Sequence, residues 1–124
     1  MLRISILTND RSDFSELSAV ISTHANCRLE WLDSVPAALT AVVDSAPDLM
    51  IIDQEVDHTS CLEVAGKIIM RNAMINLAVV SKLDDEAFHE AAEGLGIVAR
   101  IPPRAAKADF DALLKALQRV AQPV

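Results

Sequence analysis

The sequence predicts an α/β fold in which five strands alternate with five helices around a parallel sheet, a (βα)5 arrangement. Short apolar runs that end in a polar residue recur along the chain, as at 49–52 before Asp53, and such runs are typical of strands buried on both faces. Segments with helical periodicity and capping residues separate these runs, and the connections are short. We therefore expect a single domain over residues 1–124, with helices on both faces of the sheet.

Each element is predicted from local signals. Runs of apolar and β-branched residues place strands at 2–8, 27–32, 49–53, 75–80 and 96–101. Apolar stripes at helical spacing place helices at about 13–24, 35–46, 61–71, 84–94 and 107–120. Ser12 and Ser34 are expected to cap the first two helices, Asp84 to open the fourth, and Gly94 to end it. Residues 54–60 are expected to form a polar loop.

Composition excludes several classes of protein. Apolar residues make up 52% of the 124 residues, which argues against disorder. The formal net charge of −7 argues against binding to nucleic acid or to a membrane surface, both of which favour basic patches. The sequence shows no signal peptide and no spanning segment, and its two cysteines, Cys27 and Cys61, suit a reducing environment. We expect a cytoplasmic protein.

Polar side chains follow three of the predicted strands. Asp10 comes just after the first strand, Asp53 ends the third, and Ser81 follows the fourth. Because the carboxyl ends of parallel strands meet at one edge of a sheet, we expect these side chains to lie close together. A pair of carboxylates there can hold a hard divalent cation, and one of them could attack a phosphorus centre.

With these residues in these places, nearly the whole chain resembles the receiver domain of bacterial response regulators. The resemblance implies a flavodoxin-like three-layer sandwich with sheet order 2-1-3-4-5. It implies that Asp53 accepts a phosphoryl group from a histidine kinase or phosphotransfer protein and that Ser81 contacts that group. It also implies a protein of two-component phosphorelay signalling that is not an enzyme beyond its own phosphorylation and dephosphorylation.

The same resemblance implies further features of the site and surface. Asp10, Asp53 and the backbone carbonyl of Glu55 would form a weak Mg²⁺ site. The bond between Ile101 and Pro102 would be cis. A homodimer would form through the face made by the fourth helix, fifth strand and fifth helix.

The chain departs from the family pattern at the positions that support phosphorylation. Two consecutive acids usually follow the first strand, where this chain has Asn9 and Asp10. The family's lysine after the fifth strand falls on Ile101, and its aromatic switch residue falls on Val98. Losing one charged contact to a transition state commonly costs about 100-fold in rate. Lys82, directly after Ser81, could replace the missing cation, or it could be an ordinary solvated lysine.

Three function classes follow from this pattern. The chain could be a phosphoaccepting receiver, or a pseudo-receiver that binds a protein partner without phosphorylation, or a binder of a small ligand at the same crevice. A glycine-rich phosphate loop and a GxSxG elbow at Ser81 are both absent, which argues against nucleotide-binding and hydrolase functions. A Lys or Arg side chain close to Asp53 would favour the phosphoacceptor, and an apolar pocket would favour the pseudo-receiver.

Overall fold

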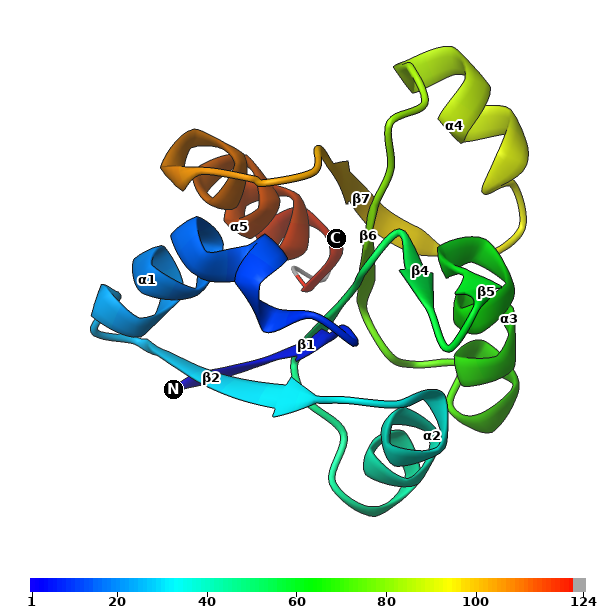
Figure 1. The fold of residues 1–124 in the computed structure, drawn as a ribbon, viewed down its shortest axis with the longest axis horizontal. Helices are drawn as coiled ribbons and strands as arrows, with labels where there is room; N and C mark the ends of the chain where they lie inside the picture. The colour runs from blue at the N-terminus through cyan, green and yellow to red at the C-terminus, as the bar shows by residue number, and fades with distance from the viewer. Residues whose placement is uncertain (122–124) are drawn as a thin grey trace.

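A computed structural model describes residues 1–121, and its centre is a five-stranded sheet in which every neighbouring pair of strands is parallel (Figure 1). The strands are β1 (Leu2–Leu7), β2 (Cys27–Leu32), β3 (Leu49–Ile52), β6 (Leu77–Val80) and β7 (Ile97–Ile101). They lie in the order β2-β1-β3-β6-β7, which confirms the expected order 2-1-3-4-5 and the flavodoxin-like topology. β2 and β7 are therefore the edges of the sheet.

Helices cover both faces of the sheet. They are α1 (Ser15–Thr23), α2 (Val35–Asp44), α3 (Cys61–Arg71), α4 (Asp85–Ala91) and α5 (Lys107–Ala121). α1 and α5 pack side by side on one face, and α2 and α3 pack side by side on the other (Figure 1). None of the helices has both the length and the apolar character needed to cross a membrane, within the described residues.

The two halves of the core are set by the alternation of side chains along each strand. In β3, Leu49 and Ile51 join the core beneath α1 and α5, whereas Met50 and Ile52 join the core beneath α2 and α3. All four are fully buried, as the unbroken apolar run predicts for a central parallel strand.

Several helix signals in the sequence act as predicted. The Ser34 side chain accepts a hydrogen bond from the backbone N–H of Ala37 at the start of α2. Asp84 caps α4 in the same way, and α3 begins and ends where its apolar stripe predicts. In each capped helix the side-chain oxygen satisfies a backbone donor that the first turn leaves free.

Three local expectations were wrong. Asp10, not Ser12, is the N-cap, and it opens a short 3-10 helix, η1 (Arg11–Phe14), ahead of α1. The stretch expected to be a polar loop contains an antiparallel hairpin, β4 (Glu55–Val56) and β5 (Thr59–Ser60). The bond before Pro102 is trans, since residues 1–121 contain no cis peptide.

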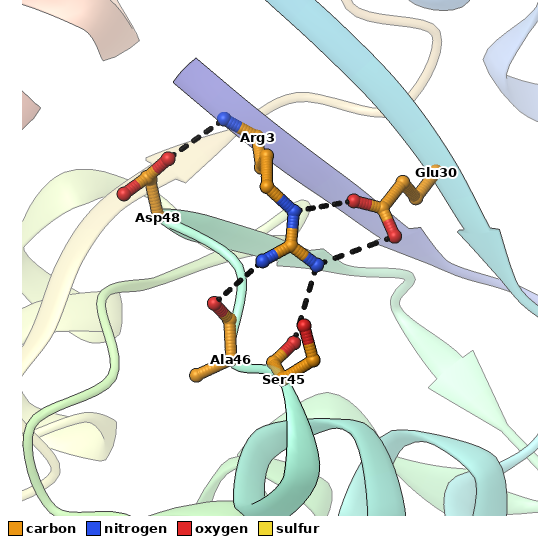
Figure 2. Close-up of polar contacts among 5 residues, drawn as sticks. All are labelled: Arg3, Glu30, Ser45, Ala46 and Asp48. Carbon is orange, nitrogen blue, oxygen red and sulfur yellow. Dashed lines mark hydrogen bonds and ion pairs between the residues drawn. The ribbon is translucent and has the colours of Figure 1, made fainter. Parts of the chain in front are cut away.

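Arg3, near the amino end of β1, contacts β2 and the segment between α2 and β3 (Figure 2). Its Nε lies 2.8 Å from Glu30 Oε1 on β2, and its Nη1 and Nη2 donate to the carbonyl oxygens of Ala46 and Ser45 beyond α2. Its backbone N–H donates to Asp48 Oδ2 at 2.7 Å. Only a planar guanidinium can make these side-chain contacts together.

Candidate functional site

Asp53 leaves the end of β3 at the carboxyl edge of the sheet, and neighbouring residues hold its carboxylate in place. Its Oδ2 accepts a 2.7 Å hydrogen bond from the hydroxyl of Thr8, and its Oδ1 accepts one of 2.7 Å from the backbone N–H of Gln54. Its own N–H donates to the carbonyl of Leu7 at 3.0 Å. Thr8, at the end of β1, is 1% exposed. Residues at the ends of β1 and β3 therefore fix the direction of the Asp53 carboxylate.

Asp53 lines a cleft of 410 Å³ that carries two acids and two bases. The acids are Asp13 and Asp53, and the bases are Lys82 and Arg104. Neither Lys82 nor Arg104 forms an ion pair within 4.0 Å in the described part of the chain. Two cations are thus available in the cleft that contains Asp53.

An adjoining cleft of 620 Å³ shares Asp13 and Asp53 with the first and adds Ser81 and Glu55 to its lining. Ser81 is 7% exposed, and its Oγ accepts a hydrogen bond of 3.1 Å from the backbone N–H of Leu83. Within the described residues the Ser81 hydroxyl donates to no acceptor, so its proton is available to a ligand. The structure thus places Asp53, Ser81 and Glu55, three of the residues expected at the site, around one hollow.

The fourth expected residue, Asp10, is directed elsewhere. Its Oδ1 accepts hydrogen bonds from the hydroxyl of Ser12 at 2.6 Å and from the Ser12 N–H at 3.0 Å, and these bonds lower its pKa. Asp10 does not line either cleft, whereas Asp13, one turn further along η1, lines both. Residues 1–121 hold no group of three or more His, Cys, Asp or Glu side chains arranged to bind a metal.

Asn9 stands at a position where receiver domains usually have an acid, and its side chain forms hydrogen bonds with the β4–β5 hairpin. Its Nδ2 donates to Asp57 Oδ1 at 3.0 Å, and its Oδ1 accepts from the Asp57 N–H at 2.7 Å. Asp57 Oδ2 also accepts the Val35 N–H at the start of α2, at 2.7 Å. The Val35 bond and then the Asn9 bond lower the pKa of Asp57. The Asn9 side chain therefore joins the loop after β1 to the β4–β5 hairpin.

The end of β7 supplies no cation from the position of the family lysine. Ile101 is 2% exposed and packs in the core beneath α1 and α5. The cation after β7 comes three residues later, from Arg104, whose φ of 57° lies in the left-handed region. A residue other than glycine is uncommon there, and such backbones are concentrated at functional sites.

Cys61 also lines the larger cleft, at the first position of α3. Its Sγ donates to the carbonyl of Val80 at 3.6 Å. Burial raises the pKa of this thiol, so that it stays protonated near neutral pH. It is therefore a packing residue at the wall of the cleft.

Sequence reasoning missed Thr8, Asp13 and Arg104. Thr8 precedes the polar pair after β1, and its place in the sequence indicates only the end of a strand. The 3-10 turn of η1 brings Asp13 rather than Asp10 to the cleft, and no motif marks that turn. The Pro102–Pro103 pair before Arg104 is the one available signal, because it stops β7 and forces the chain to turn at the edge of the sheet.

Comparison with solved structures identifies the fold. No protein-family model matches the chain, and no curated protein matches it. Among solved structures, the non-phosphorylated receiver domain of HemR from Leptospira biflexa is similar, with a TM-score of 0.78 and 17% identity, covering 100% of this chain and 99% of that one.

Two further solved structures are similar in the same way. A LuxR-family two-component response regulator from Aurantimonas sp. SI85-9A1 has a TM-score of 0.80 and 12% identity, covering 98% of this chain and 88% of that one. The response regulator domain of Thermotoga maritima CheB has a TM-score of 0.73 and 16% identity, covering 97% and 93%. At these identities the likeness establishes the fold, which is that of response-regulator receiver domains.

Proposed function

We propose that this chain works as a receiver domain of two-component signalling, in which Asp53 accepts a phosphoryl group from a histidine kinase or phosphotransfer protein. One observation carries the proposal: Asp53 lies in a cleft with Lys82 and Arg104, and the adjoining cleft joins Asp53 to Ser81. A nucleophilic carboxylate, two cations and a hydroxyl donor are the groups that phosphoryl transfer to an aspartate requires.

We assign the attack to Oδ1 of Asp53. The buried hydroxyl of Thr8 holds Oδ2, whereas within residues 1–121 the Oδ1 atom is held only by the Gln54 N–H. Oδ1 forms a new bond to phosphorus, and the bond from phosphorus to the donor's nitrogen or oxygen breaks with its electron pair leaving on the donor. The hydrogen bonds pre-orient the carboxylate, so less orientation entropy is lost in the reaction.

Charge in the cleft supports the phosphorylated state without the family lysine. Phosphorylation brings roughly one further negative charge to the carboxylate side chain, since a phosphoryl group carries about −1.5 to −2. Lys82 and Arg104 face that charge from the loops after β6 and β7. Asn9 is neutral where an acid is usual, so that less negative charge opposes the incoming group. Ser81 would donate its hydroxyl proton to a phosphoryl oxygen.

The residues present also fit a weak Mg²⁺ site, because Mg²⁺ is often bound through one or two carboxylates and keeps several waters. Asp53 and Asp13 line the shared cleft, and Glu55 lines its larger part with a backbone carbonyl to offer. Asp10 would contribute only after releasing Ser12. When bound, Mg²⁺ would neutralise charge on the phosphoryl oxygens. We therefore expect Asp13→Asn to weaken Mg²⁺ binding more than Asp10→Asn does.

Labelling by a small phosphoryl donor tests the proposal directly. Incubation with acetyl phosphate and Mg²⁺ should add one phosphoryl mass, and Asp53→Asn should abolish it. Lys82→Gln and Arg104→Asn should each slow labelling by about 100-fold. Asn tolerates the left-handed backbone at 104, so that variant removes the charge without adding strain. Lys115→Gln, an exposed change on α5, is the matched control and should label at the normal rate.

Beryllofluoride binding gives a second readout that needs no donor chemistry. Trp31 is the only tryptophan, and Arg11 of η1 lies over its ring at 5.1 Å. Ligation at Asp53 that shifts η1 should change Trp31 fluorescence, and Asp13→Asn should reduce the Mg²⁺ dependence of that change.

One specific observation favours the pseudo-receiver instead: the buried Ile101 stands where the family cation would be. Under that function the chain would bind its protein partner without phosphorylation. An absence of both acetyl phosphate labelling and beryllofluoride binding, in protein that is folded by circular dichroism, would contradict the phosphoacceptor proposal and favour the pseudo-receiver.

A further inference from the structure

The edge strand β2 has an open side. It pairs with β1 on one side only, and no other strand among residues 1–121 lies beyond it (Figure 1). The N–H groups of Leu2 and Thr8 donate to the carbonyls of Asn26 and Leu32, so the even-numbered residues of β2 direct their backbone groups toward β1. Because backbone direction alternates along a strand, the N–H and C=O groups of Leu29 and Trp31 point away from β1, toward the open side of the sheet. These outward groups are a template for another strand.

The charges on β2 are incompletely paired within the chain. Arg28 stands opposite Arg3 in the β1–β2 register, and Arg3 is already paired with Glu30 at 2.8 Å. Arg28 is exposed and forms no ion pair within the described residues. Arg28 is therefore a cation at the edge of the sheet with no carboxylate partner among the described residues, and the residue opposite it on β1 is a second cation, Arg3.

We propose that β2 pairs antiparallel with β2 of a second copy of this chain, about a two-fold axis at Leu29. In an antiparallel pair, residues opposite each other must both point their backbone groups inward or both outward. Only registers that pair odd residues with odd residues meet that condition here. Centring the axis on Leu29 places Leu29 opposite Leu29 of the second copy, and Arg28 opposite its Glu30.

Charge selects this register from its neighbours. An axis at Glu30 would set the two Glu30 carboxylates opposite each other, and an axis at Arg28 would set the two Arg28 guanidinium groups opposite each other. With the axis at Leu29, the two-fold symmetry makes the Arg28–Glu30 contact twice, at positions where side chains come closest. The β2 strand of a second copy therefore complements the charges of this β2. Pairing of the two strands would join the two sheets into one continuous sheet.

Oligomeric state under charge reversal tests this interface. The wild-type chain should show a concentration-dependent dimer by sedimentation velocity. Arg28→Glu should weaken it by about tenfold or more, because both Arg28–Glu30 contacts become repulsive. The change should leave the monomer folded, since the introduced carboxylate would lie opposite Arg3 of β1. A mixture of Arg28→Glu and Glu30→Arg should recover a heterodimer, because each of the two contacts between positions 28 and 30 then joins a carboxylate to a guanidinium group.

Cross-linking tests the register itself. Hydrogen-bonded residues opposite each other lie about 5.5 Å apart at Cα, within the disulfide range. Leu29→Cys should therefore form an intermolecular disulfide under mild oxidation. Val43→Cys, which is 61% exposed on α2, is the matched control and should not. Labelling of Asp53 should be unchanged in Arg28→Glu, which separates this interface from the phosphoacceptor function.

Two results would overturn the proposal. The first is a wild-type chain that stays monomeric through the micromolar range, in which case Arg28 and Glu30 only keep the edge solvated. The second is a dimer that Arg28→Glu leaves intact, which would place the interface elsewhere, for instance on the face of α4, β7 and α5.

Discussion

The Asn9 side chain and Asp57 are joined by two hydrogen bonds that run in opposite directions. The amide Nδ2 of Asn9 donates to Asp57 Oδ1, and its Oδ1 accepts from the Asp57 N–H, at 3.0 and 2.7 Å. An amide can donate and accept at once, whereas a carboxylate can only accept. The neutral residue at position 9 is therefore required by the hairpin, and this accounts for its departure from the acidic pattern of receiver domains.

Restoring an acid at position 9 should consequently harm the fold. Asn9→Asp would set two carboxylates against each other and leave one hydrogen bond unmade, so urea denaturation should show lower stability at neutral pH. The deficit should shrink as the pH falls toward about 3, where the carboxylates become protonated. The double variant Asn9→Asp with Asp57→Asn restores a donor opposite an acceptor and should recover most of the loss. An Asn9→Asp protein as stable as the wild type at neutral pH would contradict the pairing.

Asp57 should titrate below the usual aspartate range. The Val35 N–H and then the Asn9 amide stabilise its charged form and lower its pKa. A carboxyl group whose pKa is lower in the folded state contributes stability above its unfolded pKa, about 3.9, and loses it as the pH falls through the folded value. Carboxyl NMR titration should show the low pKa in the wild type and a shift back toward the usual range in Asn9→Ser. An unshifted Asp57 in the wild type would refute this account.

The turn between β4 and β5 should be improved by glycine at position 58. Asp57 and His58 have φ values of 52° and 61°, and a two-residue hairpin turn with both φ positive prefers Asp-Gly. His58→Gly should therefore raise the free energy of unfolding by about 1 kcal/mol. Asp57→Gly is the contrasting change, because it removes the carboxylate that accepts hydrogen bonds from Asn9 Nδ2 and the Val35 N–H, and it should destabilise. Thermal unfolding of the two variants beside the wild type measures both effects.

Arg3 should not tolerate lysine. Arg3→Lys keeps the charge but cannot bind Glu30 and the carbonyls of Ser45 and Ala46 together, so the segment after α2 loses side-chain contacts to β1 and keeps only the backbone bonds of residue 3 to Asp48. Chemical denaturation should show lower stability, and amide exchange should rise around residues 45–48. Arg71→Lys, an exposed change of the same kind at the end of α3, is the control and should have little effect. Equal stability of the two variants would show that the Arg3 contacts contribute nothing.

Local sequence signals determined the order and type of the main elements, because each rests on neighbouring residues. The four apolar residues before Asp53 point alternately to the two faces of the strand. They can all be buried only if helices cover both faces, which makes this a central strand. Ser34 and Asp84 cap helices through contacts within three residues. The meeting of Asp53 and Ser81 at one edge follows from parallel topology alone. The full order of the strands across the sheet was predicted by the family resemblance, because no local signal fixes which strands are neighbours. The alternating pattern of residues 27–32 predicts only that this strand is peripheral.

Only the tertiary structure decided which side chains face the cleft. A single turn of η1, which ends at the buried Phe14, directs Asp10 to Ser12 and brings Asp13 to the cleft of Asp53. The hairpin at 55–60 lacks glycine in its turn. It is held by a hydrogen bond to Asn9, which is far away in the sequence, so residues near the hairpin could not predict it. Arg104 reaches the cleft through a left-handed backbone that its sequence context does not predict. Directions of side chains at strand ends depend on contacts between segments far apart in the chain, and those contacts exist only once the sheet has formed.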